Sequence, residues 1–176
     1  MVVYFLRHAS AGEPLSDARK DENRALDKDG IEQCGYVGRA MAALEVELDA
    51  ILTSPLKRAA QTAALVSKEM GYQGEPVIDD ALRPEAGFGA FRSLLDRFDG
   101  RKSIMVVGHN PNLSEFLGRA ISGVRTGAGV ELKKGAVAKV EMSGTMGTLH
   151  WCITPRMLRR LHATATESSR PKTSRK

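Results

Sequence analysis

The sequence places arginine and histidine side chains directly after three short apolar segments. Leu6-Arg7-His8-Ala9 follows the first segment, Thr53-Ser54-Pro55-Leu56-Lys57-Arg58 the second, and Val107-Gly108-His109-Asn110-Pro111 the third. A guanidinium offers a planar fork of donors that matches phosphate oxygens, and a neutral imidazole can act as a nucleophile. These residue types together predict a site that binds a phosphoryl group and transfers it.

Each of these residues alone has a commoner role. Arg7 and His8 could be a strand-end salt bridge and a surface histidine, Arg58 a solvated helix residue, and His109 a capping or packing histidine. In a regular strand, Arg7 and His8 would also point to opposite faces, so they can share a ligand only where the strand has ended. The argument for chemistry is convergence, because parallel strands present their carboxyl ends, where ligands bind, at one edge of a sheet.

The hydrophobic pattern predicts the elements that bring these residues together. Short apolar runs predict strands at Val2–Leu6, Ala50–Thr53, Pro76–Ile78, Ser103–Val107, Ala136–Met142 and Thr148–Ile153. Helical spacing predicts helices at Asp29–Leu44, Pro55–Met70, Phe88–Phe98, Pro111–Ile121 and Pro155–His162. Residues 9–27 read as a long loop, a kind of segment that is often functional. Strands that alternate with helices indicate an α/β fold, with a mostly parallel sheet covered on both faces and a final hairpin that makes it mixed.

Two of the predicted helices begin with a capping residue and a proline. Ser54 is a favourable N-cap with Pro55 in the first helical position, and Asn110 with Pro111 repeats the arrangement. Free backbone N–H groups at such helix starts favour anions. Both starts therefore support a phosphate pocket.

Composition and charge narrow the class of protein. The 176 residues suit one domain, and the net charge of +5 comes from the end of the chain. Residues 155–176 hold seven Lys and Arg against Glu167, a net +6, so the rest of the chain carries −1. This distribution argues against a nucleic-acid-binding domain. We expect a domain over residues 1–163 and a basic, disordered tail over residues 164–176.

The remaining bulk features point to an ordinary intracellular protein. No apolar run reaches the roughly 18 residues of a membrane helix, and the N-terminus reads as a strand instead of a signal peptide. We therefore expect no membrane partner, a cytoplasmic location and, by default, a monomer. Cys34 and Cys152 have no metal-ligand spacing, so we expect two free, buried thiols and no metal site.

On three motifs the chain resembles the histidine phosphatase superfamily. The motifs are Arg7-His8-Ala9, the stretch Ser54-Pro55-Leu56-Lys57-Arg58-Ala59-Ala60-Gln61-Thr62-Ala63, and Gly108-His109-Asn110-Pro111. Small size and the segment Trp151-Cys152-Ile153-Thr154-Pro155 are similar to the SixA-type phosphohistidine phosphatases within it. The resemblance covers roughly Val2 to Leu161. It implies a phosphoglycerate mutase-like, three-layer α/β/α sandwich.

The resemblance also implies a metal-independent, cofactor-free enzyme. His8 would accept the phosphoryl group, Arg7, Arg58 and His109 would hold it, and Asn110 would contribute to substrate binding. Some branches use an acidic proton donor, for which Glu85 is the nearest candidate by position; the alternative is an exposed loop glutamate. A weak or missing acid favours an activated substrate such as a phosphohistidine-containing protein. A small-molecule phosphatase or mutase, and a non-catalytic phosphate-binding module, are the alternatives.

Overall fold

The computed structural model describes residues 1–123 and 127–168, which form a six-stranded sheet between helices. The strands are β1 (Val2–Arg7), β2 (Ala50–Thr53), β3 (Val77–Ile78), β4 (Ser103–Gly108), β5 (Val137–Ser143) and β6 (Met146–Ile153). Their order across the sheet is β3-β2-β4-β1-β5-β6. The first four run parallel, whereas β5 and β6 run antiparallel to β1 and to each other. The predicted mixed sheet with a final hairpin is confirmed.

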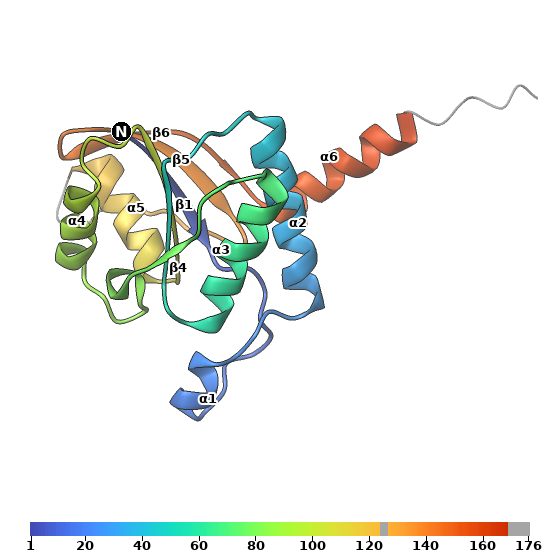
Figure 1. Ribbon diagram of the computed structural model, residues 1–176, viewed down its shortest axis with the longest axis horizontal. Helices are drawn as coiled ribbons and strands as arrows, with labels where there is room; N and C mark the ends of the chain where they lie inside the picture. Colours follow the sequence, from blue (N-terminus) through green and yellow to red (C-terminus); the bar gives the residue numbers. More distant parts are fainter. Residues whose placement is uncertain (124–126, 169–176) are drawn as a thin grey trace, which may run out of the picture.

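The helices cover both faces of this sheet, so the three-layer α/β/α sandwich is confirmed (Figure 1). One face packs against α2 (Lys28–Ala43) and α3 (Lys57–Met70), and the other against α4 (Phe88–Arg97) and α5 (Asn112–Ser122). The remaining helices are a 3-10 turn, η1 (Asp80–Leu82), the small α1 (Ala18–Glu22), and α6 (Pro155–Ser168), which contacts α2 and extends away from the body (Figure 1).

Strand β1 occupies an interior position in the sheet and is apolar on both faces. Val3 and Phe5 pack into the core under α4 and α5, whereas Tyr4 and Leu6 pack into the core under α2 and α3. The strand pairs with β4 on one side and β5 on the other. A continuously apolar run is what such a doubly covered strand requires, and it fixes the position of the residues that follow it.

Four expectations about the elements were wrong in detail. Residues 9–27 include the helix α1, whose first turn is capped by the side chain of Asp17. Helix α3 begins at Lys57 with Leu56 in the capping position, and α5 begins at Asn112 with Pro111 there. Neither Ser54 nor Asn110 is therefore an N-cap. Both side chains instead form hydrogen bonds in the site described below. Cys34 is buried as expected, but Cys152 is exposed on the edge strand β6.

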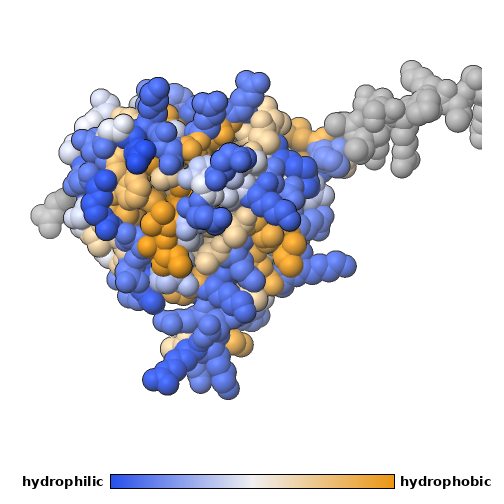
Figure 2. Space-filling model, in the orientation of Figure 1, coloured by the Kyte–Doolittle hydropathy of each residue, from blue (hydrophilic) through white to orange (hydrophobic). Residues whose placement is uncertain are grey.

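Helix α6 continues through Ser168, beyond the point at Thr164 where we expected disorder to begin. The rest of the predicted tail, residues 169–176, lies outside the described residues. Within the described part of the chain, no helix combines the length and the apolar character needed to cross a membrane. In the orientation of Figure 1, hydrophilic residues dominate the surface around α1 (Figure 2).

Candidate active site

A cavity of about 210 Å³ lies at the carboxyl ends of β1, β2 and β4, where the three motifs meet. Five predicted residues line it: Arg7, His8, Arg58, His109 and Asn110. The other lining residues are Gly12, Pro14, Asp21, Arg24, Pro84 and Lys134. The expected convergence of strand ends is therefore what the fold produces.

His8 is buried and held in one tautomer. Its Nδ1 lies 2.8 Å from the carbonyl oxygen of Ala9, and because a carbonyl only accepts, Nδ1 must carry the hydrogen. The other nitrogen, Nε2, is then unprotonated. Burial, with the nearby charges of Arg58 and Arg7, lowers the pKa of His8 to about 4, although the Ala9 contact opposes the shift. The imidazole is therefore a neutral potential nucleophile at pH 7.

The backbone around His8 is tied to three other segments. The His8 amide donates to the Gly108 carbonyl at 3.0 Å, and the Gly135 amide donates to the carbonyls of Arg7 and His8 at 3.1 Å. The Ala9 amide donates to Oγ1 of Thr62 at 3.1 Å. Regular strand geometry ends here, which is why the adjacent side chains of Arg7 and His8 can both line one cavity.

Both arginines are braced by backbone carbonyls. Nη1 of Arg7 donates to Leu132 at 2.8 Å, and Nη1 of Arg58 donates to the Asp21 carbonyl at 2.8 Å and lies 3.1 Å from the Asp21 carboxylate. The Nε atoms of Arg7 and Arg58 are buried without a hydrogen-bond partner in the described protein. A buried donor without a partner is costly, so both groups fit a site that takes up an oxyanion.

His109 is the second buried imidazole of the cavity. Its ring centroid lies 5.0 Å from that of His8, and its Nε2 lies 2.8 Å from Oγ of Ser54. Burial, followed by the neighbouring His8 and arginines, lowers the pKa of His109 to about 2. Ser54 Oγ already accepts from the Leu56 amide at 3.3 Å, so its hydroxyl hydrogen can go to His109. Nδ1, buried without a partner, then becomes a free N–H donor.

Asn110 lines the cavity, and its amide is also used within the protein. Nδ2 donates to the Leu132 carbonyl at 2.9 Å, and Oδ1 accepts from the Ser114 hydroxyl at 2.9 Å. The Leu132 carbonyl is thus shared by Asn110 and Arg7. Asn110 fixes the segment that braces Arg7, a role its place in the motif did not indicate.

The sequence reasoning missed two lining residues on and after α1. Arg24 donates from Nε to the Asp21 carboxylate at 2.8 Å and from Nη1 to the Ala11 carbonyl at 2.6 Å. The Arg24 hydrogen bond lowers the pKa of Asp21 to about 2. Asp21 is therefore ionised at neutral pH and poorly suited to donate a proton. The only sequence signal for these two residues was the length of the loop that holds them.

Glu85, the candidate acid, does not line this cavity. Its side chain is 69% exposed and lies 3.7 Å from Arg83. Arg83 also pairs with Glu22 and Asp80. The structure brings the other predicted residues together and leaves Glu85 at the surface.

The lining is mainly cationic. Arg7, Arg24, Arg58 and Lys134 face the single carboxylate of Asp21 among the lining residues that the structure describes. The described residues contain no group of three or more His, Cys, Asp or Glu side chains placed to hold a metal ion. Such a lining suits a phosphate-sized anion.

Comparison with known proteins places the chain in a family. The family model of the histidine phosphatase superfamily (branch 1) matches residues 3–102. An uncharacterized protein of Picosynechococcus is 34% identical over 140 residues, which span 78% of this chain and 82% of that protein. The phosphohistidine phosphatase SixA of Escherichia coli is 25% identical over 159 residues, or 88% of this chain and 94% of that protein.

Solved structures show the same fold. A SixA structure complexed with tungstate superposes with a TM-score of 0.79 at 24% identity, covering 90% of this chain and 99% of that one. Phosphoglycerate mutase from Bacillus anthracis gives a TM-score of 0.70 at 13% identity, covering 91% and 96%. The phosphoglycerate mutase-like fold is thereby confirmed, and the similarity to SixA supports phosphatase activity. With the family match spanning more than half of its length, the chain belongs to the histidine phosphatase superfamily (branch 1).

Proposed function

We propose that the protein removes the phosphoryl group from phosphohistidine on a protein, through a covalent phosphohistidine intermediate on His8. The observation that carries this proposal is the state of His8. Its Nδ1 is fixed on the Ala9 carbonyl and its Nε2 is unprotonated, in a cationic cavity beside His109. A phosphate-binding module would need the cations but not this nucleophile.

The reaction has two steps. The Nε2 lone pair of His8 attacks phosphorus, and the bond from phosphorus to the substrate imidazole breaks, leaving an imidazole that takes a proton from solvent. Water then attacks the phosphoryl group on His8, which releases inorganic phosphate and restores the neutral imidazole. Arg7, Arg58 and the Nδ1–H of His109 stabilise the charge on the equatorial oxygens in both steps.

The lining chemistry favours an activated leaving group. An alkoxide leaves poorly without a general acid, whereas an imidazole leaves readily. Asp21 is held ionised by Arg24, and Glu85 lies outside the cavity. The chain is similar to SixA of Escherichia coli, whose name describes a phosphohistidine phosphatase, and this similarity supports the same substrate class. We also propose that the protein acts in the cytoplasm.

Trapping the phosphoenzyme tests the proposal. The wild-type protein is mixed with a radiolabelled phosphohistidine peptide and quenched, and the protein is analysed for acid-labile, base-stable label. We expect label on the wild type and on His150→Ala, a control histidine on β6 outside the cavity, but not on His8→Ala.

Circular dichroism verifies that His8→Ala remains folded. Turnover by folded His8→Ala, or a wild type that hydrolyses the peptide without ever carrying label, would remove His8 from the nucleophile role. Hydrolysis of small phosphomonoesters in preference to the peptide would instead favour the small-molecule phosphatase or mutase alternative.

A further inference from the structure

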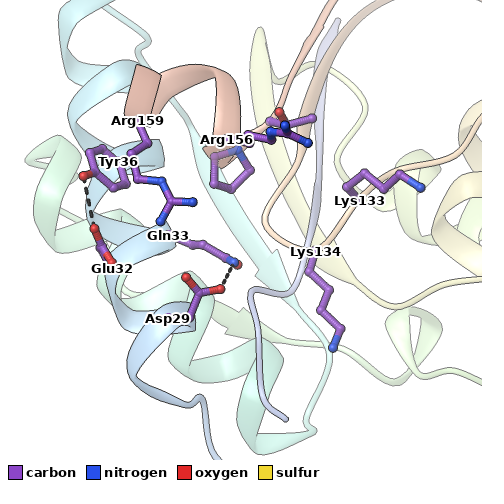
Figure 3. Close-up of a pocket in the computed structure, with 10 residues that line it drawn as sticks. Asp29, Glu32, Gln33, Tyr36, Lys133, Lys134, Arg156 and Arg159 are labelled. Atoms are coloured by element: carbon purple, nitrogen blue, oxygen red, sulfur yellow. Dashed lines mark hydrogen bonds between the residues drawn. The ribbon is translucent and has the colours of Figure 1, made fainter. Parts of the chain in front are cut away.

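A second cavity, of about 300 Å³, lies beside the active site and has no role in the chemistry above. One wall is a face of α2 with Asp29, Gln33 and Tyr36, which recur at helical spacing. The start of α6 and the segment 133–134 before β5 complete it, so we call it the α2–α6 cavity (Figure 3). It is larger than the active-site cavity, which measures about 210 Å³.

The two cavities adjoin at one shared lining residue. Lys134 lines both of them. The next residue, Gly135, donates its amide to the carbonyls of Arg7 and His8, and Gln33 accepts from the Ser10 amide at 3.0 Å. Hydrogen bonds of Gly135 and of the Gln33 side chain thus connect the walls of the α2–α6 cavity to the backbone around His8. Lys134 therefore places the α2–α6 cavity next to the cavity that holds His8.

The cavity collects positive charge on a body that is otherwise close to neutral. Lys133, Lys134, Arg156 and Arg159 line it, against Asp29 and Glu32. Both carboxylates already accept hydrogen bonds from α2 itself, Asp29 from Gln33 at 2.6 Å and Glu32 from the Tyr36 hydroxyl at 3.1 Å.

The arginines of α6 are less engaged. Among the described side chains, no carboxylate pairs with Arg156 or Arg159, and both are exposed. Figure 3 shows the Arg159 guanidinium extending from α6 toward Tyr36 and Gln33, with Lys134 on the opposite side of the cavity. Unpaired guanidinium groups at a cavity wall suit incoming carboxylates.

We propose that the α2–α6 cavity binds an acidic segment of the phosphoprotein substrate while its phosphohistidine occupies the active site. This inference rests on the proposed function. The Tyr36 ring and the buried Pro155 ring offer apolar contact for the methylene stem of a glutamate, and Arg159 with Lys134 receives the carboxylates. The cavity thus selects among phosphoproteins by the charge around the phosphorylated residue.

Two synthetic phosphohistidine peptides test this selection. They differ only in the residues on both sides of the phosphohistidine, which are glutamates in one peptide and glutamines in the other. We expect wild-type kcat/KM to favour the glutamate peptide roughly three- to tenfold, the size of one or two exposed charge pairs, and the preference to shrink as salt rises.

Charge reversal at the cavity should remove the preference. Arg159→Glu is expected to bring the ratio of the two kcat/KM values to about one or below. Arg160→Glu is the matched control, because it changes the same charge on the same exposed helix outside the cavity, and it should keep the wild-type ratio. Free phosphoimidazole reports the basal chemistry and should be hydrolysed equally by all three proteins.

The readouts separate the two proposals. Failure of the wild type on phosphoimidazole and on both peptides would contradict the proposed function. Hydrolysis of both peptides at equal kcat/KM by the wild type, or an equal loss of preference in Arg159→Glu and Arg160→Glu, would overturn the docking role of the cavity and leave the proposed function standing.

Discussion

At the scale of single residues, the site depends on which nitrogen of each histidine is already occupied. The Ala9 carbonyl fixes the hydrogen of His8 on Nδ1, and the Ser54 hydroxyl lies against Nε2 of His109, which leaves Nδ1 of His109 without a partner. The sequence identified both histidines but not these partners, because a backbone carbonyl carries no residue signature and Ser54 looked like a helix cap.

Replacing Glu85 tests whether an acid is needed. Because its side chain is exposed and outside the cavity, Glu85→Gln should hydrolyse phosphoimidazole within about twofold of the wild-type kcat/KM, an effect typical of a surface position. Steady-state phosphate release measures it. Arg58→Ala is the positive control, since it removes a phosphate-binding group. A loss of several hundred-fold in Glu85→Gln would show that this carboxyl does reach the substrate.

At the scale of elements, the strands and long helices were predictable because buried runs and amphipathic faces leave a clear pattern. Helix α1 was not, since its five residues include no buried side chain and it is set by the Asp17 cap and the contact of Asp21 with Arg58. The motif residues Gln61 and Thr62 also had no visible purpose in the sequence. Their side-chain oxygens accept hydrogen bonds from the backbone amides of Leu26 and Ala9, respectively. These bonds hold the loops on either side of α1 against α3.

A glycine in α2 lets one of these loops approach. A Cβ at Gly30 would lie 2.0 Å from the Ser10 carbonyl oxygen, a backbone atom, so the loop after His8 would have to move. Because Ala9 in that loop orients His8, Gly30→Ala should lower kcat/KM about tenfold or more and reduce Tm. Gly89→Ala is the control, as no atom lies within 4 Å of its added Cβ and alanine favours the α4 helix. Equal activity in the two variants would contradict this account.

At the scale of the whole molecule, the burial that keeps both histidines neutral lowers the stability of the fold at acidic pH. In the folded protein, burial lowers the pKa of His8 to about 4 and that of His109 to about 2, so both imidazoles stay neutral well below pH 6.5. An unfolded chain protonates both near pH 6.5. Between these limits the unfolded state binds more protons than the folded state, so stability falls as pH falls.

Urea unfolding at pH 7.5, 6 and 5 measures this linkage. Well below pH 6.5, the free energy of unfolding should fall by up to about 1.4 kcal/mol per pH unit for each buried histidine. In His8→Ala the free energy of unfolding should change with pH about half as steeply as in the wild type, because only His109 still contributes. Keeping to pH 5 and above limits the contribution of Asp21, whose folded pKa of about 2 acts in the same direction at lower pH. A wild-type free energy that is flat across this range would mean that the histidines titrate in the folded protein.

The position of β1 in the sheet affects how the chain folds during its synthesis. This strand is synthesised before both of its neighbours, because β4 and β5 come from the second half of the chain. A nascent chain therefore carries an unpaired apolar segment until residues beyond 103 leave the ribosome, and such an edge invites association with other chains. The nucleophile cannot be assembled before then, since the Gly108 and Gly135 contacts that hold it do not yet exist. A truncated translation product would thus be inactive and prone to aggregate, and the first strand is where a chaperone would have most to protect.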